Sequence, residues 1–160
     1  GSIENRMRLP LEVLDAVIAA WDKDHVGIRI SPVTDLGGSV DSDPQALFEA
    51  YVEEIEKRGP VYLHVIEGQT GGDRDKNGFD YHALRQRFSR TYMGNNDYDL
   101  DLAVKRLEAG EVDLVCYGKL FISNPDLVTR LRLGAPLNAY DHDTFYGGDE
   151  RGYTDYAFAG

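Results

Sequence analysis

One charged side chain lies inside an apolar run early in the chain. Arg29 stands between two isoleucines in residues 26–32, a short β-branched segment that ends at a proline. This composition is typical of a buried strand covered on both faces, where an unpaired guanidinium is costly. We therefore expect Arg29 to have a partner. That partner is either a carboxylate such as Glu67, in a structural ion pair, or an electron-rich ligand at the carboxyl end of the sheet.

Two short segments have the composition of a phosphate-binding turn. Residues 94–97 (Gly-Asn-Asn-Asp) precede an expected helix, and residues 117–119 (Tyr-Gly-Lys) follow an expected strand. Backbone N–H groups at a helix start, a glycine that permits close approach and a lysine charge all suit a phosphate. Glycine and asparagine also mark ordinary turns between strands and helices, so this pattern alone leaves both interpretations open.

The end of the chain is aromatic and rich in glycine. Residues 145–156 contain three tyrosines. Such a segment either folds over a pocket and presents a phenol to a ligand, or packs the terminus onto the domain. His64 and Cys116 lie in apolar strands, and we interpret both as core residues. With one cysteine and no H-E-x-x-H spacing, the sequence offers no metal site.

Helical and strand periodicities alternate along the chain. Asp43 followed by Pro44 indicates the start of one helix, and Gly59 marks its end. Strict alternation predicts parallel strands joined by right-handed crossovers, either in an open doubly wound sheet or in part of a barrel. The expected elements are a helix at 9–21, a strand at 26–32, a helix at 44–58, a strand at 61–66, a glycine-rich loop and candidate lid at 67–78, a short helix around 81–88, a strand at 91–94, a helix at 100–107, a strand at 112–117 and a last helix around 127–131.

Length and charge limit what the chain can do. With 160 residues, 42% of them hydrophobic, it can bury one core but is short for a complete eight-stranded α/β barrel of ~250 residues. Its 17 basic and 28 acidic residues give a net charge of −11, which argues against a nucleic-acid partner. The lone cysteine and the lack of a signal peptide or a membrane-spanning apolar run favour a cytoplasmic protein that binds no membrane.

Motifs along the whole chain occur in the order found in one family. Residues 1–6 (Gly-Ser-Ile-Glu-Asn-Arg) are similar to that family's Y-G-G-S-I-E-N-R, and residues 26–32 to its G-I-R-[LV]-S-P. Residues 121–127 (Phe-Ile-Ser-Asn-Pro-Asp-Leu) resemble F-I-A-N-P-D-L, and residues 145–156 resemble F-Y-G-G-G-x-x-G-Y-T-D-Y. The chain thus resembles the Old Yellow Enzyme family of FMN-dependent ene-reductases over essentially its full length.

This resemblance implies an α/β fold that is half of a (βα)8 TIM barrel, namely strands five to eight with their helices. We expect residues 1–160 to form a single segment, with 139–160 as a carboxyl-terminal lid or tail. A half barrel leaves two strand edges unpaired, so the barrel is expected to be completed by a partner half. That partner would be the amino-terminal half of the same enzyme, supplied as a separate chain or removed by cleavage.

The resemblance also implies roles for five residues. Arg29 would contact the pyrimidine side of the flavin, Asn95, Gly118 and Lys119 would hold the FMN phosphate, and Tyr146 would lie near the substrate. The family usually has arginine where Lys119 stands, so a point charge replaces a bidentate fork.

The implied activity depends on the half that this chain lacks. NAD(P)H would reduce FMN, and the reduced flavin would pass hydride to the β-carbon of an activated alkene such as an enone. No catalytic residue is expected in this chain, because the family's tyrosine proton donor belongs to the missing half; alone, the chain is expected to be inactive. The alternative is a non-catalytic half-barrel fragment or interaction module that binds FMN or a phosphate weakly. A phosphate-binding isomerase is disfavoured, because His64 and Glu67 are the only acid and base candidates near the strand ends.

Overall fold

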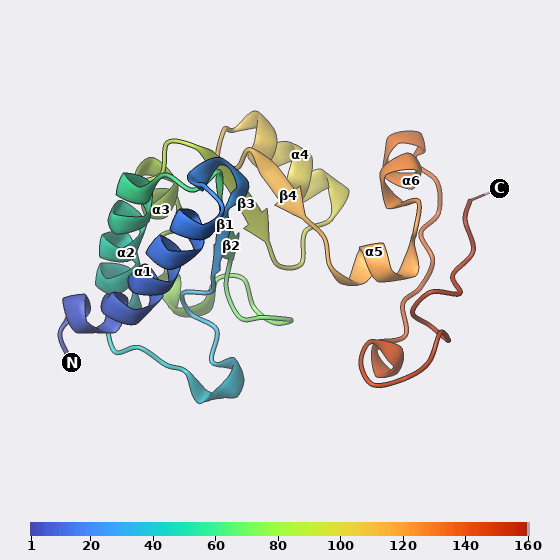
Figure 1. Ribbon diagram of the computed structural model, residues 1–160. Coiled ribbons are helices and arrows are strands. Elements are labelled where there is room, and N and C mark those ends of the chain that lie inside the picture. The colour runs from blue at the N-terminus through green and yellow to red at the C-terminus, as the bar shows by residue number, and fades with distance from the viewer. Residues whose placement is uncertain (160) are drawn as a thin grey trace. The chain divides into compact units, whose positions relative to one another are not determined.

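The computed structural model describes residues 1–159, apart from the side chain of residue 77. The chain forms two compact units, Gly1–Cys116 and a second that begins at Tyr117. The first contains the sheet and the second contains short helices and the tail (Figure 1). Within residues 1–159, no helix combines the length and the apolar composition needed to cross a membrane.

The first unit is built on one sheet of four parallel strands in the order β1-β2-β3-β4. This confirms the parallel arrangement predicted from the alternating periodicity. Each strand therefore pairs with its neighbour in sequence, as in a barrel or one side of a doubly wound sheet. The strands are β1 (Gly27–Ile30), β2 (Tyr62–Ile66), β3 (Thr91–Asn95) and β4 (Leu114–Cys116).

Helices precede the first strand and follow each strand. In the first unit they are α1 (Ile3–Ala20), α2 (Pro44–Arg58), α3 (Tyr81–Gln86) and α4 (Leu100–Glu108). The second unit contains α5 (Lys119–Ser123), which the sequence did not predict, and α6 (Leu127–Leu133). Single 3₁₀ turns lie at Lys23–His25, Leu36–Gly38, Lys76–Gly78 and His142–Thr144.

Local capping explains where α2 begins and ends. The Asp43 carboxylate accepts a hydrogen bond from the Ala46 backbone N–H at 3.2 Å. At the other end Gly59 has a φ of 69°, and its N–H bonds to the Ile55 carbonyl at 3.0 Å. Both predicted boundaries are confirmed.

Helix α1 begins earlier than predicted. The expected start at residue 9 is wrong, because the Ser2 hydroxyl accepts a hydrogen bond from the Asn5 N–H at 3.3 Å and starts the helix at Ile3. Pro10 then lies inside the helix. A proline there removes one backbone donor, yet the buried side chains of Met7 and Leu11 still hold this segment against the core.

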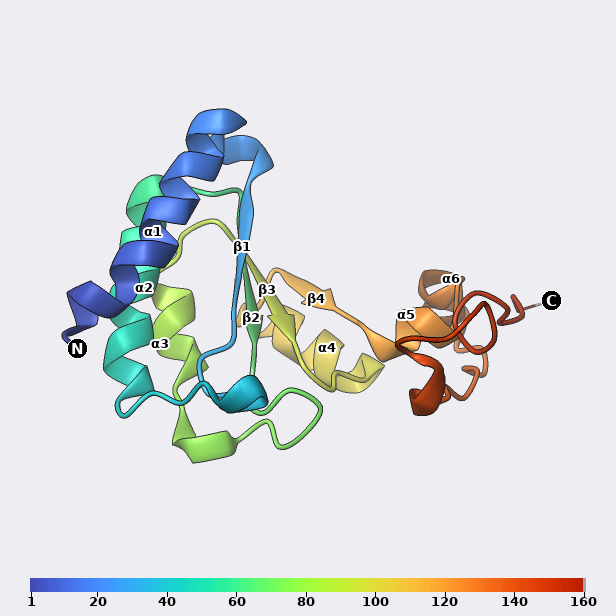
Figure 2. The same cartoon turned by 60° about the horizontal axis from the view of Figure 1, so that its bottom comes forward.

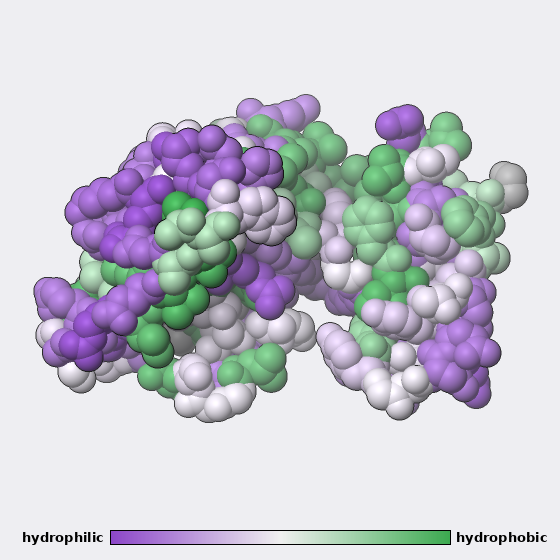
Figure 3. All heavy atoms as spheres, viewed as in Figure 1, coloured by the Kyte–Doolittle hydropathy of each residue, from purple (hydrophilic) through white to green (hydrophobic). Residues whose placement is uncertain are grey.

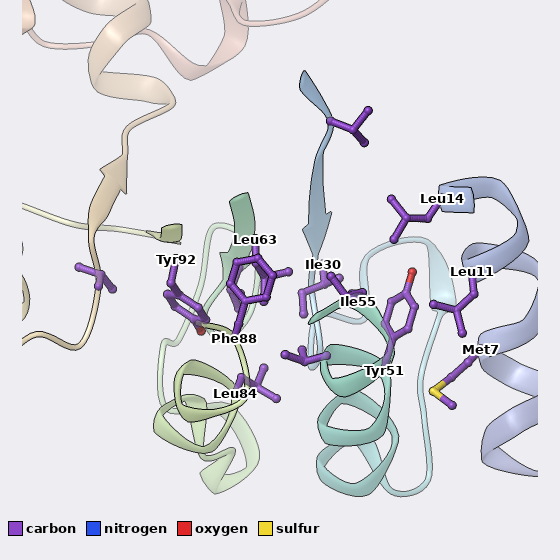
Figure 4. Close-up of a cluster of buried hydrophobic side chains, with 14 residues drawn as sticks. Met7, Leu11, Leu14, Ile30, Tyr51, Ile55, Leu63, Leu84, Phe88 and Tyr92 are labelled. Carbon is purple, nitrogen blue, oxygen red and sulfur yellow. The ribbon is translucent and has the colours of Figure 1, made fainter. Parts of the chain in front are cut away.

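The hydrophobic core lies on one side of the sheet. Leu63, Val65 and Tyr92 point from the strands toward the helices, and α1, α2 and α3 lie together on that side (Figure 2). Figure 4 shows the helix side chains that meet them, among them Tyr51, Leu84 and further residues of the same cluster.

Within the first unit, no described element covers the opposite face of the sheet. Arg29, His64, Met93 and Leu114 form one row, since register partners in parallel strands point to the same face. Arg29 and Leu114 are exposed, and the other two are half-buried. The expectation that β1 would be covered on both faces is therefore wrong within the first unit, because the helices of this unit cover one face of the sheet only. We call this side the open face.

In the second unit, hydrogen bonds tie down the tail. The buried Arg130 donates to the Asp126 carboxylate at 2.7 Å and to the Ala157 carbonyl at 2.8 Å. The Asn138 amide also donates to the Ala157 carbonyl, at 2.9 Å. The tail is thus fixed at Ala157 to the segment around α6.

Candidate functional site

Arg29 lies in the middle of the open face. Its register partner on β2 is His64, and among residues 1–159 it makes no hydrogen bond or ion pair. Two residues earlier on the same face, Gly27 pairs in register with Tyr62, and a Cβ atom at Gly27 would lie 2.2 Å from the Tyr62 ring. Glycine at this position lets the Tyr62 ring lie across β1. Arg29 therefore presents its donors beside an aromatic ring on an uncovered surface.

His64 is not the satisfied core histidine that its apolar strand suggested. Its Nε2 atom is buried and has no hydrogen-bond partner among the described residues. Burial lowers the pKa of His64, and the nearby positive charge of Arg29 lowers it further. The ring is therefore held neutral next to the arginine.

Glu67, the carboxylate considered as a partner for Arg29, pairs with other residues. It follows β2 directly and is 1% exposed. It forms ion pairs with Arg74 and with Arg106, the latter at 3.1 Å, and it accepts a hydrogen bond from the Tyr98 hydroxyl at 2.9 Å. A structural ion pair between Arg29 and Glu67 is therefore wrong.

Asn96 anchors the loop that was predicted as a lid. Its side-chain amide donates to the carbonyls of Glu67 at 2.6 Å and of Gln69 at 2.9 Å, and its Oδ1 accepts from the Gly71 N–H at 3.3 Å. Arg74 in turn donates to the Asn96 carbonyl. Residues 67–74 of the loop are thus bound to Asn96, directly after β3.

The carboxyl end of β3 contains the first predicted phosphate segment. The Asn95 amide donates to the Cys116 carbonyl at 3.0 Å and so connects β3 with β4. At Gly94, a Cβ atom would lie 2.6 Å from the Tyr98 hydroxyl, so this glycine is required by packing. Helix α4 is capped by Asp99, whose carboxylate accepts from the Leu102 N–H at 2.8 Å.

The remaining predicted site residues belong to the second unit. Gly118 precedes α5, and nothing lies within 4 Å of the position that its Cβ would occupy. The Lys119 ammonium lies 5.3 Å from the centre of the Tyr140 ring. Tyr146 is 87% exposed and meets the Phe145 ring edge-on at 6.3 Å. That these residues join Arg29 and Asn95 in one site stays a prediction.

The functional interpretation of the sequence missed the network around Glu67. Its partners Arg74 and Arg106 lie 7 and 39 residues away in sequence, so no local pattern connects them. One signal was available: a carboxylate directly after an apolar strand lies at the carboxyl edge of the sheet, where arginines from the following loop and from a later helix can reach it.

Residues 1–138 match the sequence model of the NADH:flavin oxidoreductase / NADH oxidase family. Among curated relatives, putative 12-oxophytodienoate reductase 3 of Oryza sativa subsp. japonica is 41% identical over 162 residues, covering 99% of this chain and 42% of the relative. The rice 12-oxophytodienoate reductase 7 is 43% identical over 176 residues, covering 100% of this chain and 45% of the relative.

Solved structures are similar over the same range. A morphinone reductase matches with a TM-score of 0.89 and 43% identity, covering 99% of this chain and 43% of that protein. The old yellow enzyme from Trypanosoma cruzi matches with a TM-score of 0.93 and 34% identity, covering 99% and 42%. One related morphinone reductase structure contains tetrahydroNAD. The chain therefore spans less than half the length of the relatives it matches.

Proposed function

Because the chain belongs to the NADH:flavin oxidoreductase / NADH oxidase family, we propose that it is the FMN-binding half of an NAD(P)H-dependent ene-reductase. In this proposal it supplies strands five to eight of a (βα)8 barrel and is active only with the other half. The observation that carries the proposal is Arg29, an arginine without an ion pair in the middle of an open sheet face.

The residues of this chain fit the cofactor of the family. Arg29 has donors available on the open face, and nothing lies within 4 Å of the position that a Cβ atom of Gly118 would occupy, so a phosphate would have room to approach its backbone. Arg29 would donate hydrogen bonds to the pyrimidine side of the flavin, and its positive charge would favour the reduced anion. Asn95, Gly118 and Lys119 would hold the phosphate. Bound FMN supplies the hydride chemistry that links NAD(P)H to an activated C=C bond.

The other half must supply the remaining chemistry. In this chain we assign no residue to proton transfer, so the proton added at the α-carbon of the alkene would come from the partner half. Tyr146, which is exposed, would contribute to the wall of the substrate site. Neutral His64 would stand next to Arg29 without adding a second positive charge.

A second function is favoured by the open face itself. An exposed Leu114 and a bare sheet surface also suit an interaction module without catalysis. The two functions differ in flavin content, because the module would assemble with its partner without retaining stoichiometric FMN.

Complementation would test the proposed function. The chain would be co-expressed with the portion of morphinone reductase that its match leaves uncovered, and the purified complex would be examined for flavin absorbance and for enone-dependent NADPH oxidation. We expect both in the complex and neither in the separated parts. A complex that contains no flavin would contradict the proposal and favour the interaction module.

A further inference from the structure

We propose that a polar cavity beside the loop after β2, the start of α3 and the end of α4 binds a small protonated amine that also carries a hydroxyl group. The cavity has a volume of about 250 Å³ and is lined by residues of the first unit only. Tyr92 forms part of its wall and points to the side of the sheet that the helices cover. The site is therefore separate from the open face and requires neither FMN nor a second chain.

Two of the buried polar atoms at this cavity have neither a hydrogen bond nor an ion pair among the described residues. One is the hydroxyl of Tyr92, whose side chain is 1% exposed and whose ring packs in the core (Figure 4). The other is the Nε atom of Arg106. A buried donor without a partner is costly, so a ligand with an oxygen acceptor would remove this cost at Arg106. The Tyr92 hydroxyl can donate to such a ligand or accept from it.

Four charged side chains at the cavity or next to it balance one another. Arg106 forms ion pairs with Glu67 at 3.1 Å and with Glu111 at 2.7 Å. Arg74 also pairs with Glu67, so two guanidinium groups face two carboxylates. Because these four charges cancel, the network by itself favours neither a cationic nor an anionic ligand.

Two further carboxylates line the cavity and give it a negative charge. They belong to Asp75 and Asp80, which are exposed and form no ion pair with a described residue. The Asp80 carboxylate accepts a hydrogen bond from the Ala83 N–H at 3.1 Å, whereas no backbone or side-chain donor is assigned to the Asp75 carboxylate. Two uncompensated carboxylates favour a cation. Water can satisfy the buried hydroxyl and Nε atom, but it carries no charge to offset these carboxylates.

These features together define the ligand by its chemistry. An ammonium group suits the two carboxylates and the rings of Phe79 and Tyr81, which line the cavity with their centres 4.7 Å apart. A hydroxyl group on the same molecule can accept a hydrogen bond from Arg106 and bond to Tyr92. A protonated amino alcohol such as ethanolamine combines both groups in a molecule small enough for the cavity.

Calorimetric titration of the full chain with three probes would test this site. Ethanolamine carries both groups, propylamine lacks the hydroxyl, and ethylene glycol lacks the charge. Propylamine also controls for adsorption to apolar side chains, which gather on the surface over α1 (Figure 3). At neutral pH and moderate salt, we expect saturable binding of ethanolamine, binding of propylamine that is at least about fivefold weaker, and no saturable binding of ethylene glycol.

Two matched pairs of variants would locate the binding. Tyr92→Phe and Tyr51→Phe each delete the hydroxyl of a buried tyrosine, but only Tyr92 lines the cavity. Asp75→Asn and Asp101→Asn each remove one exposed carboxylate, and only Asp75 lines the cavity. Circular dichroism would first verify that each variant keeps the helix content of the wild type. We expect Tyr92→Phe and Asp75→Asn to weaken ethanolamine binding about fivefold or more, and the two controls to leave it within about twofold of wild type.

The possible results separate this site from its rivals. If Tyr92→Phe disturbs the core, Asp75→Asn still decides, because its side chain is exposed. Absence of saturable ethanolamine binding would overturn the site. Equal weakening by Asp75→Asn and Asp101→Asn would also overturn it, since the amine would then follow the net charge of −11. Propylamine that binds as tightly as ethanolamine, without an effect of Tyr92→Phe, would overturn the hydroxyl-bearing ligand.

Discussion

Arg29 combines a permanent charge with the absence of an ion pair among the described residues. In the assembled enzyme we expect Arg29→Ala to weaken FMN binding roughly tenfold to a hundredfold, the scale of one charged hydrogen bond. The flavin reduction potential should also fall, because the positive charge that favours the reduced anion is lost. Flavin titration and redox potentiometry would measure both effects.

Two control variants separate charge from geometry at this position. Arg29→Lys keeps the charge but replaces the planar guanidinium. Relative to Arg29→Ala, it should therefore recover the flavin reduction potential more fully than the FMN affinity. Arg132→Ala removes an exposed arginine from the second unit and should change neither quantity. If Arg29→Ala retained flavin at an unchanged potential, the role assigned to Arg29 would be wrong.

His64 predicts a pH dependence of stability. Burial, and then the charge of Arg29, lower its pKa below the ordinary value of 6.5. The folded chain therefore binds fewer protons than the unfolded chain between the two pKa values. The stability from neutral His64 is fully present above about pH 6.5 and is lost as the pH falls through that window. When the pH is lowered from about 7.5 to about 5.5, the free energy of unfolding measured in urea should fall less for His64→Gln than for wild type. Equal losses would show that His64 does not contribute.

Among the elements, those with local signals were predictable. Helix α2 has its cap at Asp43 and its terminating glycine at Gly59 in the sequence itself, and the structure confirms both ends. The start of α1 was missed because the prediction rested on apolar residues at helical spacing from residue 9 onward, whereas the Ser2 cap lies further back. Helix α5 has five residues, too few for an amphipathic period to be recognised in the sequence.

Contacts between distant segments could not be predicted in the same way. The prediction for Arg29 assumed a strand covered on both faces, but the exposure of this side chain depends on which sheet face the helices cover. Glu67 was considered as its partner, yet arginines from a loop and from α4 occupy that carboxylate. Side-chain pairing of this kind depends on tertiary structure, which the strand pattern does not specify.

The loop after β2 is held in place by the side chain of Asn96, which directly follows β3. Asn96→Ala removes three hydrogen bonds to this loop and should lower the free energy of unfolding by about 2 kcal/mol, since each net hydrogen bond contributes roughly 0.5–1.5 kcal/mol. Asn96 also has a φ of 104°, which glycine adopts more easily than alanine. Asn96→Gly should therefore be less destabilised than Asn96→Ala.

Urea unfolding and the rate of proteolysis within residues 67–78 would measure these effects. Both variants should be cleaved faster than wild type, because each frees the loop. Wild-type stability and cleavage in both variants would mean that Asn96 does not anchor the loop.

At the scale of the whole molecule, the first unit contains a complete core of its own. The buried cluster extends from Met7 to Val112 and includes no residue of the second unit. We therefore expect a chain shortened to residues 1–116 to unfold cooperatively with heat, as followed by circular dichroism. A gradual transition without a baseline would show that the core requires the second unit.

The single thiol of the chain has a practical consequence for following assembly. Cys116 pairs in register with Asn95, so its side chain belongs to the open face, and it is half-buried there. No other cysteine competes for a maleimide reagent. The modification rate of this one sulfur is therefore a native reporter. As a second half closes over the strands, a maleimide would react with Cys116 more slowly, and a fluorophore already attached there would change its emission.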